Sequence, residues 1–295
     1  MATANVNGVD LYCERYGEGT PVIFIHGGYG GPATSVVPPT PQAIVNVLAG
    51  QAAYLITYDR RCAGRSQYVL DTFSLEDIAG DAAGLLDHFE VERAVVVGSS
   101  AGGPIALQFA LLWPERVIGL ALPNTGPGLM CEPPLGYFEP YPEGVTRRLA
   151  RVRSFLEQAE GARETGDRAY FESRQEILRN PPLPPGSATP PPERAARVRE
   201  ALASVDDDTL FRYYIGMLRN YEAYAGRDFT SRLGELSMPA FIVHGTADLA
   251  VPVEYAEVLK AGIAHADYHT IDGAGHGIMG NAEAQKLLRE WILKL

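Results

Sequence analysis

Residues 93–107 read Arg93-Ala94-Val95-Val96-Val97-Gly98-Ser99-Ser100-Ala101-Gly102-Gly103-Pro104-Ile105-Ala106-Leu107, and the hydrophobic period changes within this stretch. The consecutive apolar residues before Gly98 are typical of a strand buried on both faces, whereas those after Gly102 recur at helical spacing. The stretch therefore predicts a strand, a sharp turn and a helix. The turn, Gly98-x-Ser100-x-Gly102, matches the nucleophile-elbow pattern, in which a strained turn exposes a serine hydroxyl above the end of a sheet. The alternative is a simple turn made of small residues.

Length, composition and charge limit the class of protein. The 295 residues allow one large α/β domain with an insertion, or two domains, and a hydrophobic content of 46% is typical of a globular protein. We expect no membrane-spanning helix, because no run of about 18 apolar residues occurs. Residues 1–5 lack the basic start of a signal peptide. The net charge of -11 disfavours nucleic acid and anionic membranes as partners.

The cysteines indicate the compartment. Cys13, Cys62 and Cys131 are an odd number and have no Cys-x-x-Cys spacing. This pattern fits a reducing compartment and offers no metal site, so we expect a cytoplasmic protein without a bound metal.

The first part of the chain alternates strands with helices. Asn7-Gly8 lies between two short alternating segments and predicts a hairpin at a sheet edge. Further strands are expected at 21–25, 53–58, 94–97 and 117–122, and helices near 41–51, 74–89 and 101–112. Strands and helices that alternate at such short intervals predict a parallel sheet with helices on both faces.

The pattern breaks after residue 125. Residues 126–232 contain no convincing strand, and seven prolines between 181 and 192 predict a stiff extended connection. Helices are expected near 144–160, 166–179, 193–204 and 207–225. We interpret 126–232 as an inserted all-helical cap, with a merely stabilising insertion as the alternative. Strands at 240–245 and 268–271 and helices at 252–262 and 283–295 resume the core, which would comprise 1–125 and 233–295.

Two glycine-rich loops follow predicted strands. His26-Gly27-Gly28-Tyr29-Gly30-Gly31 comes directly after the strand 21–25 and offers bare backbone N–H groups, as an oxyanion site requires. A flexible surface loop is the alternative. His276 lies in Gly273-Ala274-Gly275-His276-Gly277, after the last strand, where ligands gather in open α/β sheets.

A serine nucleophile needs a base and a group that orients the base. We assign His276 as the base of Ser100, and expect structural roles for His244 and the other histidines. Asp248 is our candidate for the orienting acid, because it lies beyond the strand 240–245 at the same sheet edge as His276. Asp272 is too close to His276 to turn back easily, and the arginines beside Asp59 suggest an ion pair that fixes its loop.

The order Ser100, Asp248, His276 resembles that of the α/β-hydrolase superfamily, and the resemblance covers the whole chain. It rests on five motifs: His26-Gly27-Gly28, Tyr58-Asp59-Arg60-Arg61 with Gly64 and Ser66, Gly98-x-Ser100-x-Gly102-Gly103, Gly245-x-x-Asp248-x-x-Val251-Pro252, and Gly275-His276. The first two are most similar to the proline iminopeptidase-like and small-esterase branches, although this chain has Cys62 where those branches often have glycine.

The resemblance implies an eight-stranded, mostly parallel sheet with an inserted helical cap. It also implies an oxyanion hole made by the backbone N–H groups of Gly28 and Ala101. Ala101 begins a predicted helix, where free N–H groups favour a negative oxygen. A serine at position 100 argues against the dehalogenase and epoxide hydrolase branches, which use a carboxylate nucleophile.

We therefore expect a serine hydrolase that needs no cofactor and cleaves a small, partly apolar ester or lactone through an acyl-enzyme. Candidate substrate contacts are Tyr29, Tyr137 and Tyr214, and the cap aromatics Phe138, Tyr141, Tyr213, Tyr221 and Tyr224 are further candidates unless they form the cap's own core. Three alternatives stay open: an aminopeptidase that uses acidic cap residues, a carbon–carbon bond hydrolase, and a ligand receptor on a hydrolase scaffold. The sequence leaves open whether the chain forms homo-oligomers.

Overall fold

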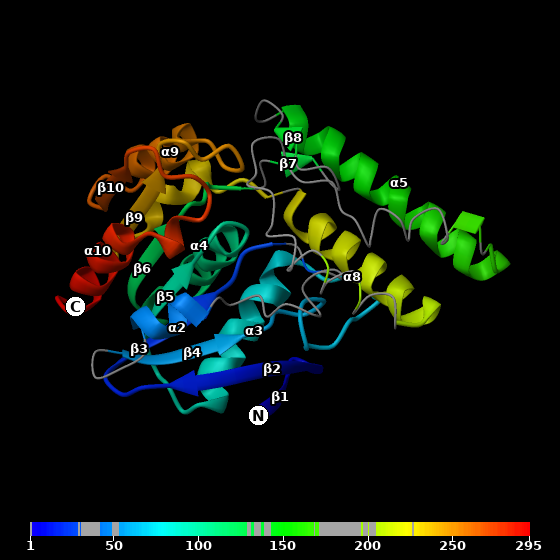
Figure 1. The fold of residues 1–295 in the computed structure, drawn as a ribbon, viewed down its shortest axis with the longest axis horizontal. Coiled ribbons are helices and arrows are strands. Elements are labelled where there is room, and N and C mark those ends of the chain that lie inside the picture. Colours follow the sequence, from blue (N-terminus) through cyan, green and yellow to red (C-terminus); the bar gives the residue numbers. More distant parts are fainter. Residues whose placement is uncertain are drawn as a thin grey trace.

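The computed structural model describes most of the chain (Figure 1). The described residues are 2–28, 30, 42–48, 53–128, 131–132, 137–138, 143–167, 169–170, 196, 200, 205–225 and 227–295. Among them, no helix is both long enough and apolar enough to cross a bilayer.

An eight-stranded sheet forms the centre of the molecule, in the order β1-β2-β4-β3-β5-β6-β9-β10. β1 and β2 pair antiparallel, as do β2 and β4, and every other pair is parallel. This confirms the predicted mostly parallel sheet. The strands are β1 (Ala2–Val6), β2 (Val9–Tyr16), β3 (Thr20–Ile25), β4 (Ala53–Tyr58), β5 (Ala94–Gly98), β6 (Val117–Pro123), β9 (Ala240–Gly245) and β10 (Asp267–Ile271).

Local signals explain where several elements begin and end. Asn7 and Gly8 both have positive φ, at 50° and 75°, as the predicted two-residue hairpin turn requires. Ser74 caps α3 (Leu75–His88), and Asp77 completes a capping box by accepting from the Ser74 backbone N–H. The remaining core helices are α2 (Gln42–Leu48), α4 (Gly102–Leu112), α9 (Val253–Gly262) and α10 (Ala282–Ile292), with short 3-10 turns at Pro114–Arg116, Thr230–Glu235 and Ile278–Gly280.

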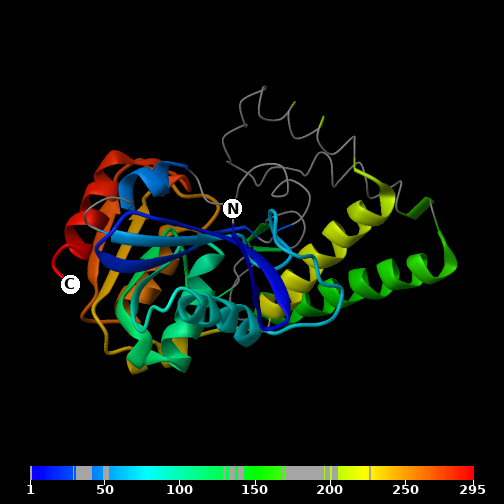
Figure 2. The same cartoon turned by 90° about the horizontal axis from the view of Figure 1, so that it is seen from below.

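Helices cover both faces of the sheet (Figure 2). Because side chains alternate along a strand, Val95 and Val97 belong to the apolar cluster that includes residues of α2 and α10, whereas Val96 belongs to the cluster on the other face, which includes residues of α3, α4 and α9. All five residues of β5 are buried, which explains its continuous apolar sequence. β5 lies in the interior of the sheet, so the loop that follows it has neighbouring strand ends on both sides.

The segment between β6 and β9 lies outside the sheet. Two long helices, α5 (Glu143–Thr165) and α8 (Asp207–Ala225), pack against each other and project beyond the sheet in both views (Figures 1 and 2). The expectation of an all-helical insertion is wrong in one respect, because β7 (Cys131–Glu132) and β8 (Tyr137–Phe138) form a small antiparallel pair. Two-residue strands carry too little alternation to be visible in the sequence.

The other predictions for the insertion are tested only in part. Helix 207–225 is confirmed by α8, and α5 extends the helix expected at 144–160. Most of 166–179 and 193–204 and the proline-rich connection lie outside the described residues. The division into a core of 1–125 with 233–295 and a cap of 126–232 stays a prediction.

Candidate active site

The candidate site lies at the carboxyl ends of the parallel strands. Ser100 follows β5, Asp248 follows β9 and His276 follows β10. Parallel strands present these ends at one edge of the sheet, and their loops converge there. Residues that lie 176 positions apart in the chain, Ser100 and His276, are therefore brought into contact.

The turn at Ser100 is strained and tightly packed. Ser100 has a φ of 52°, which is unusual for a residue with a side chain. A Cβ on Gly98 would lie 2.5 Å from the carbonyl oxygen of Gly102, and one on Gly102 would lie 2.1 Å from that of Ile25. Both glycines are thus needed for strand, turn and helix to approach this closely, as the sequence pattern predicted.

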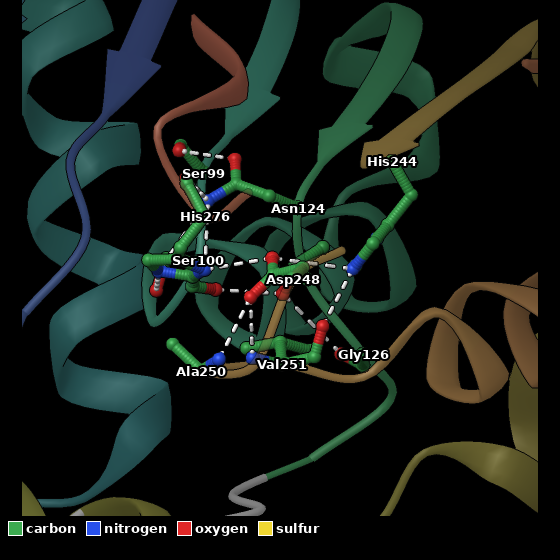
Figure 3. A network of polar contacts seen from close by, with 10 residues as sticks. Ser99, Ser100, Asn124, Gly126, His244, Asp248, Ala250, Val251 and His276 are labelled. Atoms are coloured by element: carbon green, nitrogen blue, oxygen red, sulfur yellow. Dashed lines mark hydrogen bonds and ion pairs between the residues drawn. The ribbon is translucent and has the colours of Figure 1, made fainter. Parts of the chain in front are cut away.

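Ser100, His276 and Asp248 form a continuous hydrogen-bonded chain (Figure 3). His276 Nδ1 lies 2.8 Å from Asp248 Oδ2, and His276 Nε2 lies 2.9 Å from Ser100 Oγ. The carboxylate accepts a hydrogen bond from Nδ1–H, so the neutral ring has its proton on Nδ1. The unprotonated Nε2 then accepts the hydrogen bond of the Ser100 hydroxyl. The Asp248 side chain is fully buried, whereas that of His276 is 35% exposed and Ser100 is also partly exposed, so the acid is shielded from solvent and the other two members can be reached by a substrate.

Asp248 is held by more groups than the sequence analysis expected. Its Oδ1 accepts the backbone N–H groups of Ala250 and Val251, at 2.8 and 2.9 Å. His244, which we expected to have only a structural role, is fully buried with Nε2 3.4 Å from Asp248 Oδ2 and 2.7 Å from the carbonyl oxygen of Val251. Burial opposes ionisation of Asp248, but hydrogen bonds from His244, His276 and Val251 together hold its pKa well below the ordinary value.

Asn124 positions the loop that carries His276 and was missed by the sequence analysis. It follows β6 with a φ of 41°, and its Nδ2 donates to the carbonyl oxygen of His276 at 3.1 Å. Ser99 Oγ donates to Asn124 Oδ1 at 3.0 Å and fixes the orientation of the amide (Figure 3). A polar residue at a strand end beside the elbow is the signal that could have found it.

The peptide group between Gly27 and Gly28 lies beside Ser100. A Cβ on Gly27 would be 2.8 Å from the Cβ of Ser100. His26 Nε2 accepts the backbone N–H of Arg60 at 3.0 Å, so the ring proton is on Nδ1, which donates to the Gly27 carbonyl oxygen at 2.7 Å. Burial first, and then the Arg60 cation, lower the pKa of His26 well below its ordinary value and keep the ring neutral.

The peptide group between Ser100 and Ala101 is fixed by its carbonyl oxygen. Thr125 Oγ1 donates to this oxygen at 2.6 Å, and the Gly103 N–H donates to it at 2.9 Å. N–H and C=O point in opposite directions in a trans peptide, so these bonds also direct the Ala101 N–H. Among the described residues, neither the Gly28 nor the Ala101 N–H has a protein acceptor.

The remaining sequence predictions have mixed outcomes. Asp59 forms the expected loop-fixing ion pair, but with Arg65 at 2.7 Å rather than with the arginines directly beside it. Asp272 accepts from Thr246 Oγ1 and takes no part in the chain of bonds. Tyr214 is buried in the core that α8 shares with the sheet, whereas Tyr29 and the side chain of Tyr137 lie outside the described residues.

No group of three or more His, Cys, Asp or Glu side chains within the described part of the chain is arranged to hold a metal ion. The side chains of Cys13 and Cys62 are both buried in the core. Cys62 has a φ of 59°, which gives the physical reason why a glycine suits this position in similar sequences.

Comparisons with known proteins agree with this architecture. A family model of the alpha/beta hydrolase fold matches residues 20–282. The chain is 28% identical over 279 residues to the putative carbamate hydrolase RutD of Azorhizobium caulinodans, covering 94% of this chain and 91% of that protein. It is also 28% identical, over 268 residues, to the 2-hydroxy-6-oxononadienedioate/2-hydroxy-6-oxononatrienedioate hydrolase of Cupriavidus pinatubonensis, covering 90% and 84% of the two chains.

Among solved structures, a thermophilic esterase from Thermogutta terrifontis superposes with a TM-score of 0.68 and 24% sequence identity, covering 99% of this chain and 98% of that chain. This likeness concerns the fold. The family match is more informative for the site, because it runs from β3 to the start of α10 and so includes every strand-end loop described above.

Proposed function

This chain belongs to the α/β hydrolase fold family, and we propose that it is a serine hydrolase that transfers an acyl group to Ser100 and then to water. The observation that carries the proposal is the line of hydrogen bonds from Ser100 Oγ through His276 to the buried Asp248. A serine hydroxyl is a weak nucleophile at neutral pH, and this arrangement supplies the base and the group that orients it.

Each member of the triad has one role in the proposed reaction. Ser100 Oγ attacks the substrate carbonyl while His276 Nε2 takes its proton, and the imidazolium that forms is stabilised by Asp248. His276 then returns the proton to the leaving group, which departs and leaves an ester on Ser100. Water enters with His276 again as the base, and the acid is released.

The negative oxygen of the tetrahedral intermediate would be bound by the backbone N–H groups of Gly28 and Ala101. Two features support this role: both N–H groups are free of protein acceptors among the described residues, and both peptide groups are fixed through their carbonyl oxygens. Donors held in place before the reaction cost no reorganisation when charge develops. The N-terminus of α4 adds a favourable dipole at Ala101.

We propose a small, partly apolar ester or lactone as the substrate. Leu249 directly follows the catalytic Asp248 and is 57% exposed, which offers an apolar contact at the rim of the site. Three described acidic residues that could instead bind a substrate ammonium, in α8 or directly before it, have partners of their own. Asp206 accepts from Thr209, Asp208 pairs with Arg212, and Glu222 pairs with Arg219 at 2.9 Å. These contacts favour the ester over the aminopeptidase alternative.

A fluorophosphonate probe tests the proposal, because it modifies only an activated serine. We expect the wild-type protein to be labelled and the Ser100→Ala variant to be unlabelled, with a loss of turnover on the order of 10⁶-fold. Ser99→Ala tests the selectivity of the probe, since it removes the neighbouring hydroxyl and its bond to Asn124 but leaves the triad in place, and it should still be labelled at Ser100. Labelling of Ser100→Ala, or none of the wild type, would overturn the assignment.

The substrate class needs a separate panel. p-Nitrophenyl esters of increasing acyl length, aliphatic lactones, amino-acid p-nitroanilides and a vinylogous diketone acid distinguish ester, lactone, peptide and carbon–carbon bond hydrolysis. We expect the highest kcat/KM with the esters or lactones. A protein that is labelled at Ser100 and prefers the anilides would keep the mechanism and change the substrate.

A further inference from the structure

Arg60 is a buried cation without a carboxylate partner among the described residues. The side chain has no exposed surface, and it is the largest of the fully buried side chains. The residues on either side of Arg60 have partners of opposite charge: Asp59 binds Arg65, and Arg61 binds Asp81. An arginine keeps its charge in a protein, so burial without a counter-ion is costly unless neutral dipoles solvate it.

The dipoles around Arg60 belong to the proposed oxyanion hole. Arg60 Nη2 donates to the carbonyl oxygen of Gly28 in a short hydrogen bond and lies 3.4 Å from that of Gly27. The Gly27 carbonyl is part of the same peptide group as the Gly28 N–H. Arg60 therefore contacts, from behind, the peptide group that would donate to the oxyanion.

Tyr224 extends this contact to Ala101, the residue that carries the second donor, through the peptide group that follows that donor. Arg60 Nη1 donates to Tyr224 OH at 2.6 Å, and Tyr224 OH donates to the carbonyl oxygen of Ala101 at 2.7 Å. Tyr224 is fully buried, and burial raises its pKa to about 12, so the hydroxyl keeps its proton. A chain of hydrogen bonds thus links Gly28 and Ala101 through one arginine and one tyrosine.

The two linking residues come from different parts of the fold. Arg60 follows β4 in the core, whereas Tyr224 lies near the end of α8 in the insertion. α8 also contacts the same loop through Asn220, whose Nδ2 donates to the carbonyl oxygen of Arg61 at 3.4 Å. The loop that carries Arg60 and the backbone carbonyl of Ala101 are therefore both held by residues of α8.

We propose that Arg60 and Tyr224 are positioning residues that hold the backbone at Gly28 and Ala101, polarise the Gly28 N–H, and make the reaction depend on the position of α8 against this loop. This inference rests on the proposed acyl-transfer function. A cation that donates to the Gly27 carbonyl oxygen polarises that amide and strengthens its N–H, which is the Gly28 donor, while the bond to the Gly28 carbonyl oxygen holds the backbone in place. The positive charge also favours the anionic intermediate over the neutral substrate, because the surroundings are buried.

The kinetic signature follows from this preference for the intermediate. Arg60→Met should lower kcat and kcat/KM together by about 10- to 100-fold with little change in KM, because the lost interaction is made only in the transition state. This is less than the about 100- to 1000-fold loss when an oxyanion donor itself is removed. Tyr224→Phe should have a smaller effect in the same direction. The double variant should be no slower than Arg60→Met alone, because both residues act through one chain of bonds.

A matched arginine–tyrosine pair provides the control. On the surface, Arg15 Nη1 lies 3.4 Å from Tyr54 OH, with the guanidinium 6.0 Å from the ring centre. Arg15→Met and Tyr54→Phe make the same chemical changes away from the site, and we expect them to leave kcat and KM within about 2-fold of wild type.

Affinity for a boronic acid separates positioning from damage to the fold. A boronic acid forms a tetrahedral adduct with an active serine and resembles the intermediate, so its inhibition constant should rise in Arg60→Met by the same factor as kcat/KM falls. An unchanged constant, additive losses in the double variant, or full activity of Arg60→Met and Tyr224→Phe would overturn the inference. Should Arg60→Met fail to fold, Tyr224→Phe decides alone. Labelling of wild type at Ser100 by the fluorophosphonate shows in each case that the proposed function itself still stands.

Discussion

Arg60 and Arg61 are consecutive in the sequence and both are buried, yet their surroundings have opposite chemistry. Arg61 forms two hydrogen bonds with the Asp81 carboxylate in α3, from Nε at 2.7 Å and from Nη2 at 2.6 Å. Arg60 faces the site, and its partners among the described residues are carbonyl oxygens and a hydroxyl. The first arrangement joins two core elements, whereas the second leaves a positive charge beside the proposed oxyanion hole.

The difference shows how one loop can serve stability and chemistry at once. A carboxylate beside Arg60 would neutralise the charge that is useful to an anionic intermediate, while a missing carboxylate beside Arg61 would leave a buried cation unpaired. Burial raises the pKa of Asp81 above its ordinary value even with Arg61 present, so the cost of desolvating the pair is large. Arg61 and Arg60 should therefore respond differently when their partners are changed.

The largest expected effect is on stability, at Asp81. Asp81→Asn keeps the shape of the side chain but leaves Arg61 without a counter-charge, and we expect the free energy of unfolding to fall by about 3–5 kcal/mol. Urea unfolding followed by circular dichroism measures this change. The folded fraction should keep its kcat, in contrast to Arg60→Met, whose kcat should fall with a smaller loss of stability.

An exposed ion pair serves as the control for Asp81. Arg232 Nη2 lies 2.8 Å from Glu235 Oε2, and the two side chains are 43% and 54% exposed. Glu235→Gln should change the free energy of unfolding by less than about 1 kcal/mol. If Asp81→Asn were as mild as this control, or if it lowered kcat as Arg60→Met does, the contrast between the two arginines would disappear.

The second expected effect concerns the contact between α8 and the loop. A Cβ on Gly216 of α8 would lie 2.8 Å from the Cβ of Cys62 and 2.9 Å from its Sγ. Gly216→Ala should therefore overpack this contact and cost about 1–3 kcal/mol in unfolding free energy. The displacement of α8 should also lower kcat, because Tyr224 lies on the same helix.

Two variants sharpen the test at Gly216. A Cβ on Gly161 of α5 would meet nothing within 4 Å, so Gly161→Ala should gain up to about 1 kcal/mol from helix propensity and leave kcat unchanged. Cys62→Gly removes the side chain that a Cβ on residue 216 would contact, and glycine suits the positive φ at position 62. The double variant Cys62→Gly/Gly216→Ala should therefore recover part of the unfolding free energy and part of the kcat that Gly216→Ala loses. If Gly216→Ala lost stability but kept its kcat, the position of α8 would not affect the reaction at the site.

The sequence predicted the core and the triad because each depends on local signals. Continuous apolar runs gave the buried strands, and glycines beside Ser100 and His276 gave the strand-end loops. Parallel topology then required these loops to meet at one edge. Arg60, Tyr224 and Asn124 carry no local signal of this kind. Their roles come from contacts across 123–164 residues of sequence, and such contacts follow only from how α8 and the strand-end loops pack.

His244 shows the same limit from another side. Its position at the end of a buried apolar strand indicated packing, and it is indeed fully buried. Its contact with Asp248 arises because the chain turns back four residues later, so that Val251 O and Asp248 Oδ2 both face its Nε2. Hydrophobic period identifies a buried position but does not reveal which polar atoms face it.

The third prediction concerns the buried carboxylate of Asp248 in acid. Hydrogen bonds hold the pKa of Asp248 below its ordinary value, so its stabilising contribution is complete above about pH 4 and is lost as the pH falls through the folded-state value. Between pH 4 and pH 3 the wild type should lose about 1 kcal/mol of unfolding free energy relative to Asp248→Asn. Ser100→Ala keeps Asp248 and should follow the wild type. If the unfolding free energies of wild type and Asp248→Asn changed by the same amount between pH 4 and pH 3, Asp248 would not be held as an anion.

The smallest expected effect is an absence of reaction at Cys62, the residue after Arg61. Two neighbouring arginines favour a thiolate, but burial dominates and raises the pKa of Cys62 to about 12. In a Cys131→Ser background, iodoacetamide at pH 8 should leave Cys62 and the buried Cys13 unmodified in the folded protein, as peptide mass mapping can verify, and should modify both in urea.

Because Cys62 packs against Gly216 of α8, any modification without denaturant reports that α8 has moved away from the loop. Rapid labelling of Cys62 in the folded Cys131→Ser protein would mean that the loop that carries Arg60 opens to water for much of the time, and the contrast with Arg61 would then lie in mobility rather than in charge. Labelling that becomes faster only in Gly216→Ala would instead tie the burial of Arg60 to the seating of α8.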